Sequence, residues 1–286
     1  GHVTGVQTCA LPICANAKRL LSGRGQFVDD VVLPRMLHAA VLRSPHAHAR
    51  ITRLDVGAAR QAEGVVRVLT GADVAAMCKP YVGVLKHIKG MQSAPQLPMA
   101  VDVARWQGEP VAMVVAQTRA LAEDAVQLIE AEYEPLPAVT NIETALDAAT
   151  PLIHPQLGSN LCFERFIDSG KVDEVFAKAD KVVEATFTTS RHTPVSLETR
   201  TMLADFNAPE GLLTVWHSTQ VPYMMQWIIA HHYGLAENNV RVIAPDVGGA
   251  FGMKIHTYGD DMATVAAALA TGRPVKFVAD RLESFG

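Results

Sequence analysis

The chain has 286 residues, of which 49% are hydrophobic and 19% are charged, so it carries enough apolar material for a large buried core. Its 25 Lys and Arg residues against 29 Asp and Glu residues give a formal net charge of −4, which provides no basic surface for nucleic acid or an anionic membrane. No apolar run approaches the roughly 20 residues that span a bilayer. The composition predicts a globular protein of one large domain or two ordinary ones.

The first fourteen residues, GHVTGVQTCALPIC, contain two of the four cysteines but no Asp, Glu, Lys or Arg. A signal peptide would need a basic start and a longer apolar stretch, and a cysteine-pair metal site would need a matching second pair. Residues 3–13 instead resemble the translation of a short-read sequencing adapter. We therefore expect residues 1–14 to be an adapter-derived artefact outside the fold.

The other two cysteines, Cys78 and Cys162, stand far apart in the sequence and do not indicate a disulfide framework. Isolated thiols are typical of proteins in a reducing compartment. We therefore expect a cytoplasmic protein, with the periplasm as the alternative.

The first half of the chain has strand patterns at 36–44, 49–56 and 64–74, followed by an irregular connection at 78–103. A β-α-β pattern comes next, with a strand within 108–118, a helix from Arg119 and an extended stretch at 132–136. Low periodicity and many turn-forming residues then predict a linker at 139–169.

The second half begins with a short helix within 171–187 that is expected to lead into a strand at 182–190. Further strands are predicted at 212–219, 239–247 and 274–280. Two helices are predicted from their end signals, one from Pro222 to Gly234 and one from Gly259 to Gly272.

The stretch DVGGAFGMK, residues 246–254, lies between a predicted strand and a predicted helix. Three glycines within five positions allow the backbone to approach a ligand closely, and amides at a helix start suit anions. An ordinary strand-to-helix turn would have the same pattern. The glycine spacing fits neither a P-loop nor the Rossmann fingerprint, so NAD or ATP binding is disfavoured.

Other polar residues have structural as well as functional explanations. Gln220 could orient a cofactor or cap a turn, and Glu198 and Arg200 are expected to form a salt bridge. The histidine pairs are expected to be structural, in a loop and at a helix end; they are His46, His48, His231 and His232.

Several motifs together carry a family resemblance. GRGQFVDDVVLPRMLHAAVLRSPHAHARI, GEPVAMVVA and EAEYEPLPAV resemble the α/β hammerhead domain of the xanthine dehydrogenase/aldehyde oxidase family. LLTVWHSTQVP, VRVIAPDVGGAFGMK and GRPVKFVADRLESF resemble the first part of that family's molybdenum-cofactor domain. The resemblance implies an α+β fold with a hammerhead domain at 15–138, the linker at 139–169, and the N-terminal part of a cofactor-binding domain at 170–286.

The resemblance implies the large subunit of a molybdenum hydroxylase, which holds molybdenum through a pyranopterin, either molybdopterin or its cytosine dinucleotide form. Such enzymes hydroxylate an aldehyde or an N-heterocycle with oxygen derived from water, and the protein binds and orients the cofactor. Electrons leave through [2Fe–2S] clusters and FAD. We expect both on partner subunits, because this chain has no cysteine set for a cluster.

The resemblance also assigns cofactor-binding roles to six residues. Gln220 matches the glutamine of the family's STQ motif, whose side chain lies beside the molybdenum ligands. Phe251 matches the aromatic residue of the GGGFG motif, whose backbone N–H points at the apical oxo ligand. The flanking motif positions are Gly248, Gly249, Ala250 and Gly252.

The chain departs from the family pattern within this motif and just beyond it. Ala250 replaces a glycine, so a positive φ there would be strained. Ile255 stands where purine-oxidising relatives carry a glutamate that contacts substrate, which disfavours xanthine. The general-base glutamate belongs to the family's C-terminal portion, so no catalytic residue is predicted here. We expect an N-terminal fragment that is inactive alone; the alternative is a non-catalytic hammerhead-type module for binding or assembly.

Overall fold

The computed structural model describes residues 16–82, 88–190 and 192–285, so the expected adapter-derived segment lies outside the described residues. Up to residue 138 the elements are α1 (Ala17–Leu21), η2 (Val28–Asp30), β1 (Leu37–Arg43), β2 (Ala49–Asp55), α2 (Gly57–Gln61), β3 (Val65–Thr70), α3 (Gly71–Ala75), β4 (Val103–Ala104), β5 (Pro110–Ala116), α4 (Arg119–Val126) and β6 (Glu130–Pro135). Beyond it they are η3 (Pro155–Leu157), α5 (Val172–Ala177), β7 (Thr201–Asn207), β8 (Leu212–His217), α6 (Pro222–Tyr233), η4 (Glu237–Asn239), β9 (Val240–Ile243), η5 (Met253–Ile255), α7 (Gly259–Thr271) and β10 (Val275–Val278). The predicted α+β class is confirmed.

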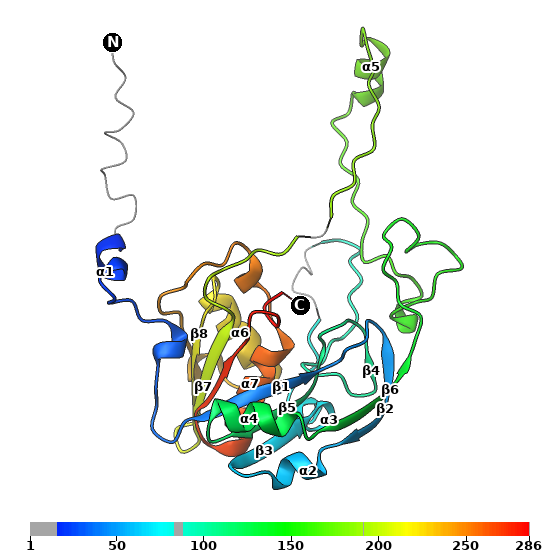
Figure 1. The fold of residues 1–286 in the computed structure, drawn as a ribbon. Helices are drawn as coiled ribbons and strands as arrows, with labels where there is room; N and C mark the ends of the chain where they lie inside the picture. Colours follow the sequence, from blue (N-terminus) through cyan, green and yellow to red (C-terminus); the bar gives the residue numbers. More distant parts are fainter. Residues whose placement is uncertain (1–15, 83–87, 191, 286) are drawn as a thin grey trace, which may run out of the picture.

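A seven-stranded sheet with the order β3-β5-β1-β10-β7-β8-β9 forms the centre of the protein (Figure 1). Strands β1 and β10 pair in parallel, with Leu37 opposite Val275, so elements from distant parts of the sequence lie side by side. A smaller sheet has the order β4-β2-β6. The central sheet therefore takes strands from both predicted segments, 15–138 and 170–286, and the boundary between these segments stays a prediction.

Strand β5 shows how the central sheet is covered on both faces. All seven of its residues are buried. Met113 and Val115 belong to the core cluster that includes residues of α6 and α7, whereas Ala112, Val114 and Ala116 belong to the cluster that includes residues of α2 and α4. Because neither face meets water, the strand has a continuous apolar sequence rather than an alternating one.

The two long helices of the second half begin and end where the sequence predicts. Helix α6 has Pro222 in its first turn and ends at Gly234, which has φ +66°. Helix α7 ends at Gly272, which has φ +60°. Left-handed glycines of this kind terminate helices because they lack the Cβ that makes the conformation costly.

The strand predicted at 64–74 is correct only up to Thr70. Residues Gly71–Ala75 form α3 instead, because the Thr70 hydroxyl accepts a hydrogen bond from the Asp73 amide while the Asp73 carboxylate accepts one from the Thr70 amide. This reciprocal capping box starts a helix at the point where the strand ends.

The strand predicted at 182–190 is wrong, and β7 was not predicted. Residues 161–190 are exposed throughout and form an extended arm with α5 near its tip (Figure 1). The apolar residues of 182–190 have no neighbouring strand among the described residues, so the β pattern there does not produce a ladder.

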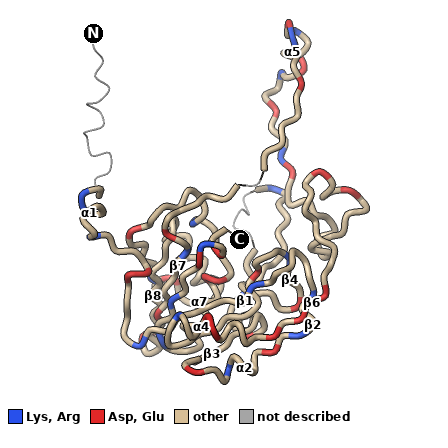
Figure 2. The backbone as a smooth tube through the Cα atoms, in the orientation of Figure 1, with Lys and Arg blue, Asp and Glu red and all other residues tan. Residues whose placement is uncertain are grey.

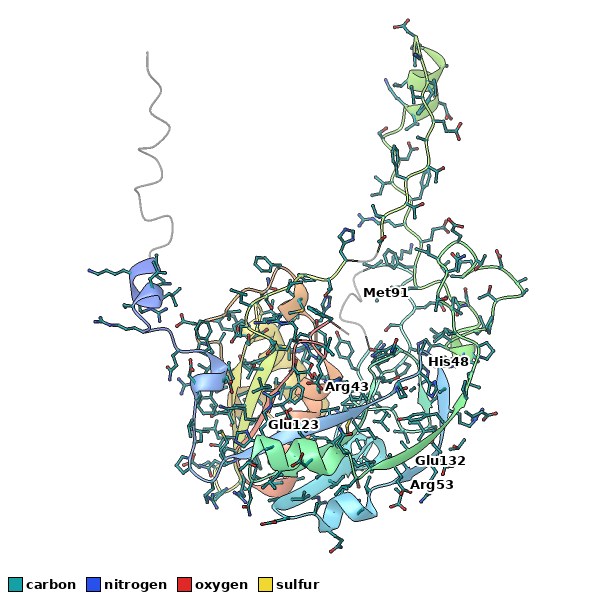
Figure 3. The ribbon with its side chains drawn as sticks, viewed as in Figure 1. Arg43, His48, Arg53, Met91, Glu123 and Glu132 are labelled. Atoms are coloured by element: carbon teal, nitrogen blue, oxygen red, sulfur yellow. The ribbon has the colours of Figure 1, made fainter. Side chains whose placement is uncertain are left out.

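Acidic and basic residues are interspersed over the described part of the molecule (Figure 2). On the small sheet Arg53 lies beside Glu132 (Figure 3), with Nη1 and Oε1 3.1 Å apart. Exposed pairs of this kind contribute little to stability, because water screens the two charges. None of the described helices has the length and apolar character needed to cross a membrane.

Candidate functional site

The predicted site residues follow two neighbouring strands of the central sheet. Strands β8 and β9 pair in parallel, with Leu213 opposite Val240. Gln220 comes after β8, and residues 248–252 come after β9. Because the carboxyl ends of parallel neighbours meet at the same edge of a sheet, the fold brings both segments to the place where open α/β sheets bind ligands.

Two hydrogen bonds join these segments directly. The Gly252 amide donates to Oε1 of Gln220 at 3.1 Å, and the Gln220 amide donates to the carbonyl oxygen of Lys254 at 3.0 Å. Gln220 therefore lies against the glycine-rich loop, here defined as residues 248–252. All six residues that the sequence assigns to cofactor binding belong to this one cluster, and their roles stay predictions.

The glycine-rich loop contains a tight turn with left-handed backbone. The Met253 amide donates to the Ala250 carbonyl oxygen at 2.9 Å, and the two residues between them, Phe251 and Gly252, have φ +53° and +92°. These angles are those of a type I′ turn. Ala250 has no positive φ, so its Cβ causes no backbone strain at this position. The strain falls on Phe251, at a typical cost of about 1–2 kcal/mol.

The loop and Gln220 carry hydrogen-bond donors that have no partner among the described residues. Among the described residues, no acceptor lies within reach of the backbone N–H groups of Gly249, Ala250 and Phe251, or of Nε2 of Gln220. The Phe251 side chain is 75% exposed, so the turn is open on that side. Successive unpaired amides in such a turn suit an oxygen-rich anionic group. The donor set therefore fits a molybdenum–pterin group with its oxo and phosphate oxygens.

One carboxylate oxygen of Glu198 binds the start of the glycine-rich loop. Oε2 of Glu198 accepts hydrogen bonds from the Gly248 amide at 2.8 Å, the Ser218 hydroxyl at 2.7 Å and Nζ of Lys254 at 2.7 Å. The Lys254 side chain is completely buried. Burial lowers the pKa of Lys254, while the Glu198 carboxylate favours its charged form.

The salt bridge predicted between Glu198 and Arg200 is wrong. The chain bends at Leu197 and Glu198, so the two side chains take different partners. Arg200 donates from Nη1 and Nη2 to the two carboxylate oxygens of Asp260, at 2.5 and 2.8 Å. The partner that sequence proximity suggested is thus replaced by one 60 residues away.

Asp260 connects helix α7 to β1 as well. Nη2 of Arg43, at the end of β1 (Figure 3), lies 2.7 Å from Oδ2 of Asp260, and Nε of Arg43 lies 2.8 Å from Glu283. Burial alone would raise the pKa of Asp260, but the guanidinium groups of Arg200 and Arg43 hold it well below its usual range. Tyr258 lies under Arg200, with the guanidinium carbon 3.9 Å from the ring centre. This ionic cluster fixes the start of α7, shortly after the loop.

Sequence reasoning missed Ser218, Lys254 and Asp260. Lys254 did carry a signal, because a single lysine follows an otherwise uncharged run from Val247 to Met253. A buried lysine almost always has a carboxylate partner. Ser218 and Asp260 had no comparable signal.

Two of the histidines predicted to be structural make contacts of that kind, and the described cysteines form no pair. Nδ1 of His48 is 2.7 Å from the Pro137 carbonyl oxygen, and His231 stacks on Trp227 at the end of α6. Cys78 is buried and Cys162 is exposed, and neither forms a disulfide. Within residues 16–82, 88–190 and 192–285, no group of three His, Cys, Asp or Glu side chains could hold a metal ion.

Comparison with protein families gives two matches. Residues 22–137 match the a/b hammerhead domain of aldehyde oxidase and xanthine dehydrogenase, and residues 153–286 match the molybdopterin cofactor-binding domain. The predicted succession of a hammerhead domain and the start of a cofactor-binding domain is thus confirmed.

Individual relatives agree with these matches. The chain is 36% identical to the nicotine 6-hydroxylase large subunit of Paenarthrobacter nicotinovorans over 93% of this chain and 32% of that protein. It is also 36% identical to the carbon monoxide dehydrogenase large chain of Afipia carboxidovorans, over 93% of this chain and 34% of that protein. The chain thus spans about a third of the length of these curated relatives.

Solved structures show the same relationship. The crystal structure of quinoline 2-oxidoreductase from Pseudomonas putida 86 superposes with a TM-score of 0.88 and 39% sequence identity, covering 95% of this chain and 34% of that one. Sequence, domain order and fold agree along nearly the whole chain. The chain belongs to the xanthine dehydrogenase/aldehyde oxidase family of molybdenum hydroxylase large subunits.

Proposed function

We propose that this chain supplies one wall of the molybdenum–pterin site in a hydroxylase that oxidises an N-heterocycle or an aldehyde. The observation that carries the proposal is the convergence of Gln220 and the glycine-rich loop at the carboxyl ends of β8 and β9. Their donors have no partner among the described residues, and residues 153–286 match the molybdopterin cofactor-binding domain. A bound molybdenum–pterin group would supply the oxidation of an electron-poor carbon with oxygen derived from water.

The residues of this chain bind and orient that group. The backbone N–H groups of Gly249, Ala250 and Phe251 offer donors in fixed directions, because the type I′ turn and the Glu198 contacts set the loop. Oε1 of Gln220 accepts from the Gly252 amide, so Nε2 remains available to donate to a bound group. Fixed donors of this kind stabilise negative charge without reorganisation during reaction.

The substrate class follows from two observations. Nicotine and quinoline, in the names of two relatives, are both N-heteroaromatic compounds. Ile255, which is 39% exposed just beyond the loop, offers an apolar side chain rather than a carboxylate that would accept hydrogen bonds from a purine. We therefore favour a non-purine N-heteroaromatic substrate over xanthine.

Partner subunits complete the proposal. The names of several relatives describe large subunits or chains of complexes. We propose that [2Fe–2S] and FAD subunits accept the electrons, and that these 286 residues alone do not turn over substrate. The chain spans about a third of the relatives' length, and we assign no general base among its described residues.

A chimera tests the proposal. Residues 22–286 replace the corresponding region of the quinoline 2-oxidoreductase large subunit, with which they superpose closely. We expect about one molybdenum and one pterin per large subunit, measured by metal analysis and pterin fluorescence, and at least a several-fold loss of molybdenum in the Gln220→Ala chimera. A folded, assembled chimera without molybdenum would overturn the proposal.

A further inference from the structure

We propose that Glu198 is a positioning residue that sets the glycine-rich loop in its cofactor-facing conformation. The inference rests on the proposed function only where it concerns the cofactor. Its structural part, that Glu198 determines the position of Gly248 and the following amides, stands on the contacts of this chain alone.

One oxygen atom of Glu198 accepts hydrogen bonds from three segments that are distant from it in the sequence. Its Oε2 binds Ser218 from the segment after β8, Gly248 from the loop, and Lys254 from η5. Oε1 of Glu198 is buried and has no donor among the described residues, so Oε2 carries all three contacts. The position of this oxygen therefore fixes both sides of the candidate site relative to each other.

The backbone reinforces the same contact. The Glu198 amide donates to the Gly248 carbonyl oxygen at 3.1 Å, while the Gly248 amide donates to Oε2 of Glu198. A Cβ at Gly248 would lie 2.5 Å from the Glu198 Cβ, so the approach requires a glycine. The Lys254 carbonyl oxygen meanwhile accepts bonds from the Gln220 amide and the Thr219 hydroxyl, both at 3.0 Å.

The negative charge of Glu198 also stabilises a buried lysine. Lys254 is fully buried, and Glu198 is the carboxylate with which it forms an ion pair. A buried ammonium without a carboxylate is expensive, so loss of the Glu198 charge would draw Lys254 toward solvent or toward its neutral form. Either change moves η5, which directly follows Gly252 and carries the carbonyl oxygen that binds Gln220.

The test begins with amide hydrogen exchange in the 286-residue chain, comparing wild type with Glu198→Gln. This substitution keeps the side-chain shape and removes the charge. We expect exchange at Gly248 to rise about five- to tenfold, because a hydrogen bond to a charged acceptor becomes one to a neutral acceptor. Exchange in β5 should stay unchanged. Glu109→Gln is the matched control, since Glu109 is also a buried carboxylate bound to a backbone amide, that of Arg105.

A second readout concerns the cofactor. In the loaded chimera, Glu198→Gln is expected to lower molybdenum occupancy several-fold and to shift the Mo(V) electron paramagnetic resonance signal, whereas Glu109→Gln changes neither. A purely structural residue would affect yield without altering the signal of the molecules that remain loaded.

The outcomes are separable. Unchanged exchange at Gly248 in Glu198→Gln would overturn the positioning role, whatever the chimera does. Altered exchange in a chain whose parent chimera binds no molybdenum would support positioning and defeat the proposed function. Altered exchange with unchanged molybdenum occupancy and an unchanged signal would show that the position of Gly248 does not matter to the cofactor. If Glu198→Gln does not fold, Lys254→Met is the second variant: it removes the other partner of the pair, and unchanged exchange at Gln220 and Gly252 would then overturn the role.

Discussion

Replacing Asp260 by asparagine tests whether the buried ionic cluster stabilises the fold. This cluster joins α7 to β1 through Arg43 and to the segment before β7 through Arg200. Asp260 is 1% exposed and binds both guanidinium nitrogens of Arg200, which is 4% exposed, and a third from Arg43. Asparagine keeps the shape but leaves Arg200 without its carboxylate partner, whereas Arg43 keeps its contact with Glu283. Removing one partner of a buried ion pair lowers the unfolding free energy by about 3–5 kcal/mol. This loss corresponds to a fall in Tm on the order of 10 °C.

The assay is urea unfolding of the 286-residue chain at pH 7, followed by circular dichroism. Glu123→Gln is the control, because Glu123 forms an exposed pair with Arg119 at 2.6 Å and should cost less than about 1 kcal/mol. The pKa of Asp260 is lower in the folded state than its ordinary 3.8, so its stabilisation is present above about pH 4 and is lost as the pH falls further. Asp260→Asn should flatten this acid limb. If Asp260→Asn lowered the unfolding free energy no more than Glu123→Gln does, the reasoning would be refuted.

Three further predictions follow from single contacts. Burial raises the pKa of Glu109 to about 7. Because the carboxylate ionises between pH 5.5 and pH 8.5, the unfolding free energy of wild type should fall by about 2 kcal/mol relative to that of Glu109→Gln over this range. An equal difference between the two proteins in urea unfolding at both pH values would contradict this. Phe251→Gly should raise the unfolding free energy by about 1 kcal/mol by relieving the positive φ, whereas Phe251→Ala retains a Cβ and should not; equal values would count against strain at this position. Gly248→Ala should lower the unfolding free energy by about 1–3 kcal/mol, because the new Cβ meets Glu198, and stability equal to wild type would show that the loop yields easily.

Local signals in the sequence were enough to predict much of the fold. Pro222, Gly234 and Gly272 mark the ends of α6 and α7 because their backbone preferences act within one turn of the helix. The apolar run of β5 predicts a strand, and the structure shows that this strand is buried on both faces. These features depend only on residues that are neighbours in the chain.

Features that depend on distant partners could not be predicted in the same way. Arg200 pairs with Asp260 rather than with Glu198, and no local pattern distinguishes the two carboxylates. The apolar residues of 182–190 have the composition of a strand, but a strand also needs a neighbour, which the described residues do not provide. The cofactor loop was predicted through family resemblance, because its glycine spacing alone equally suits an ordinary turn.

The most direct measurement is anomalous diffraction at the molybdenum edge from crystals of the loaded chimera. The proposed site predicts a molybdenum peak facing the backbone N–H of Phe251 and Nε2 of Gln220, at the carboxyl ends of β8 and β9. A peak elsewhere in a correctly folded chimera would contradict the assignment of this loop as the wall of the cofactor site.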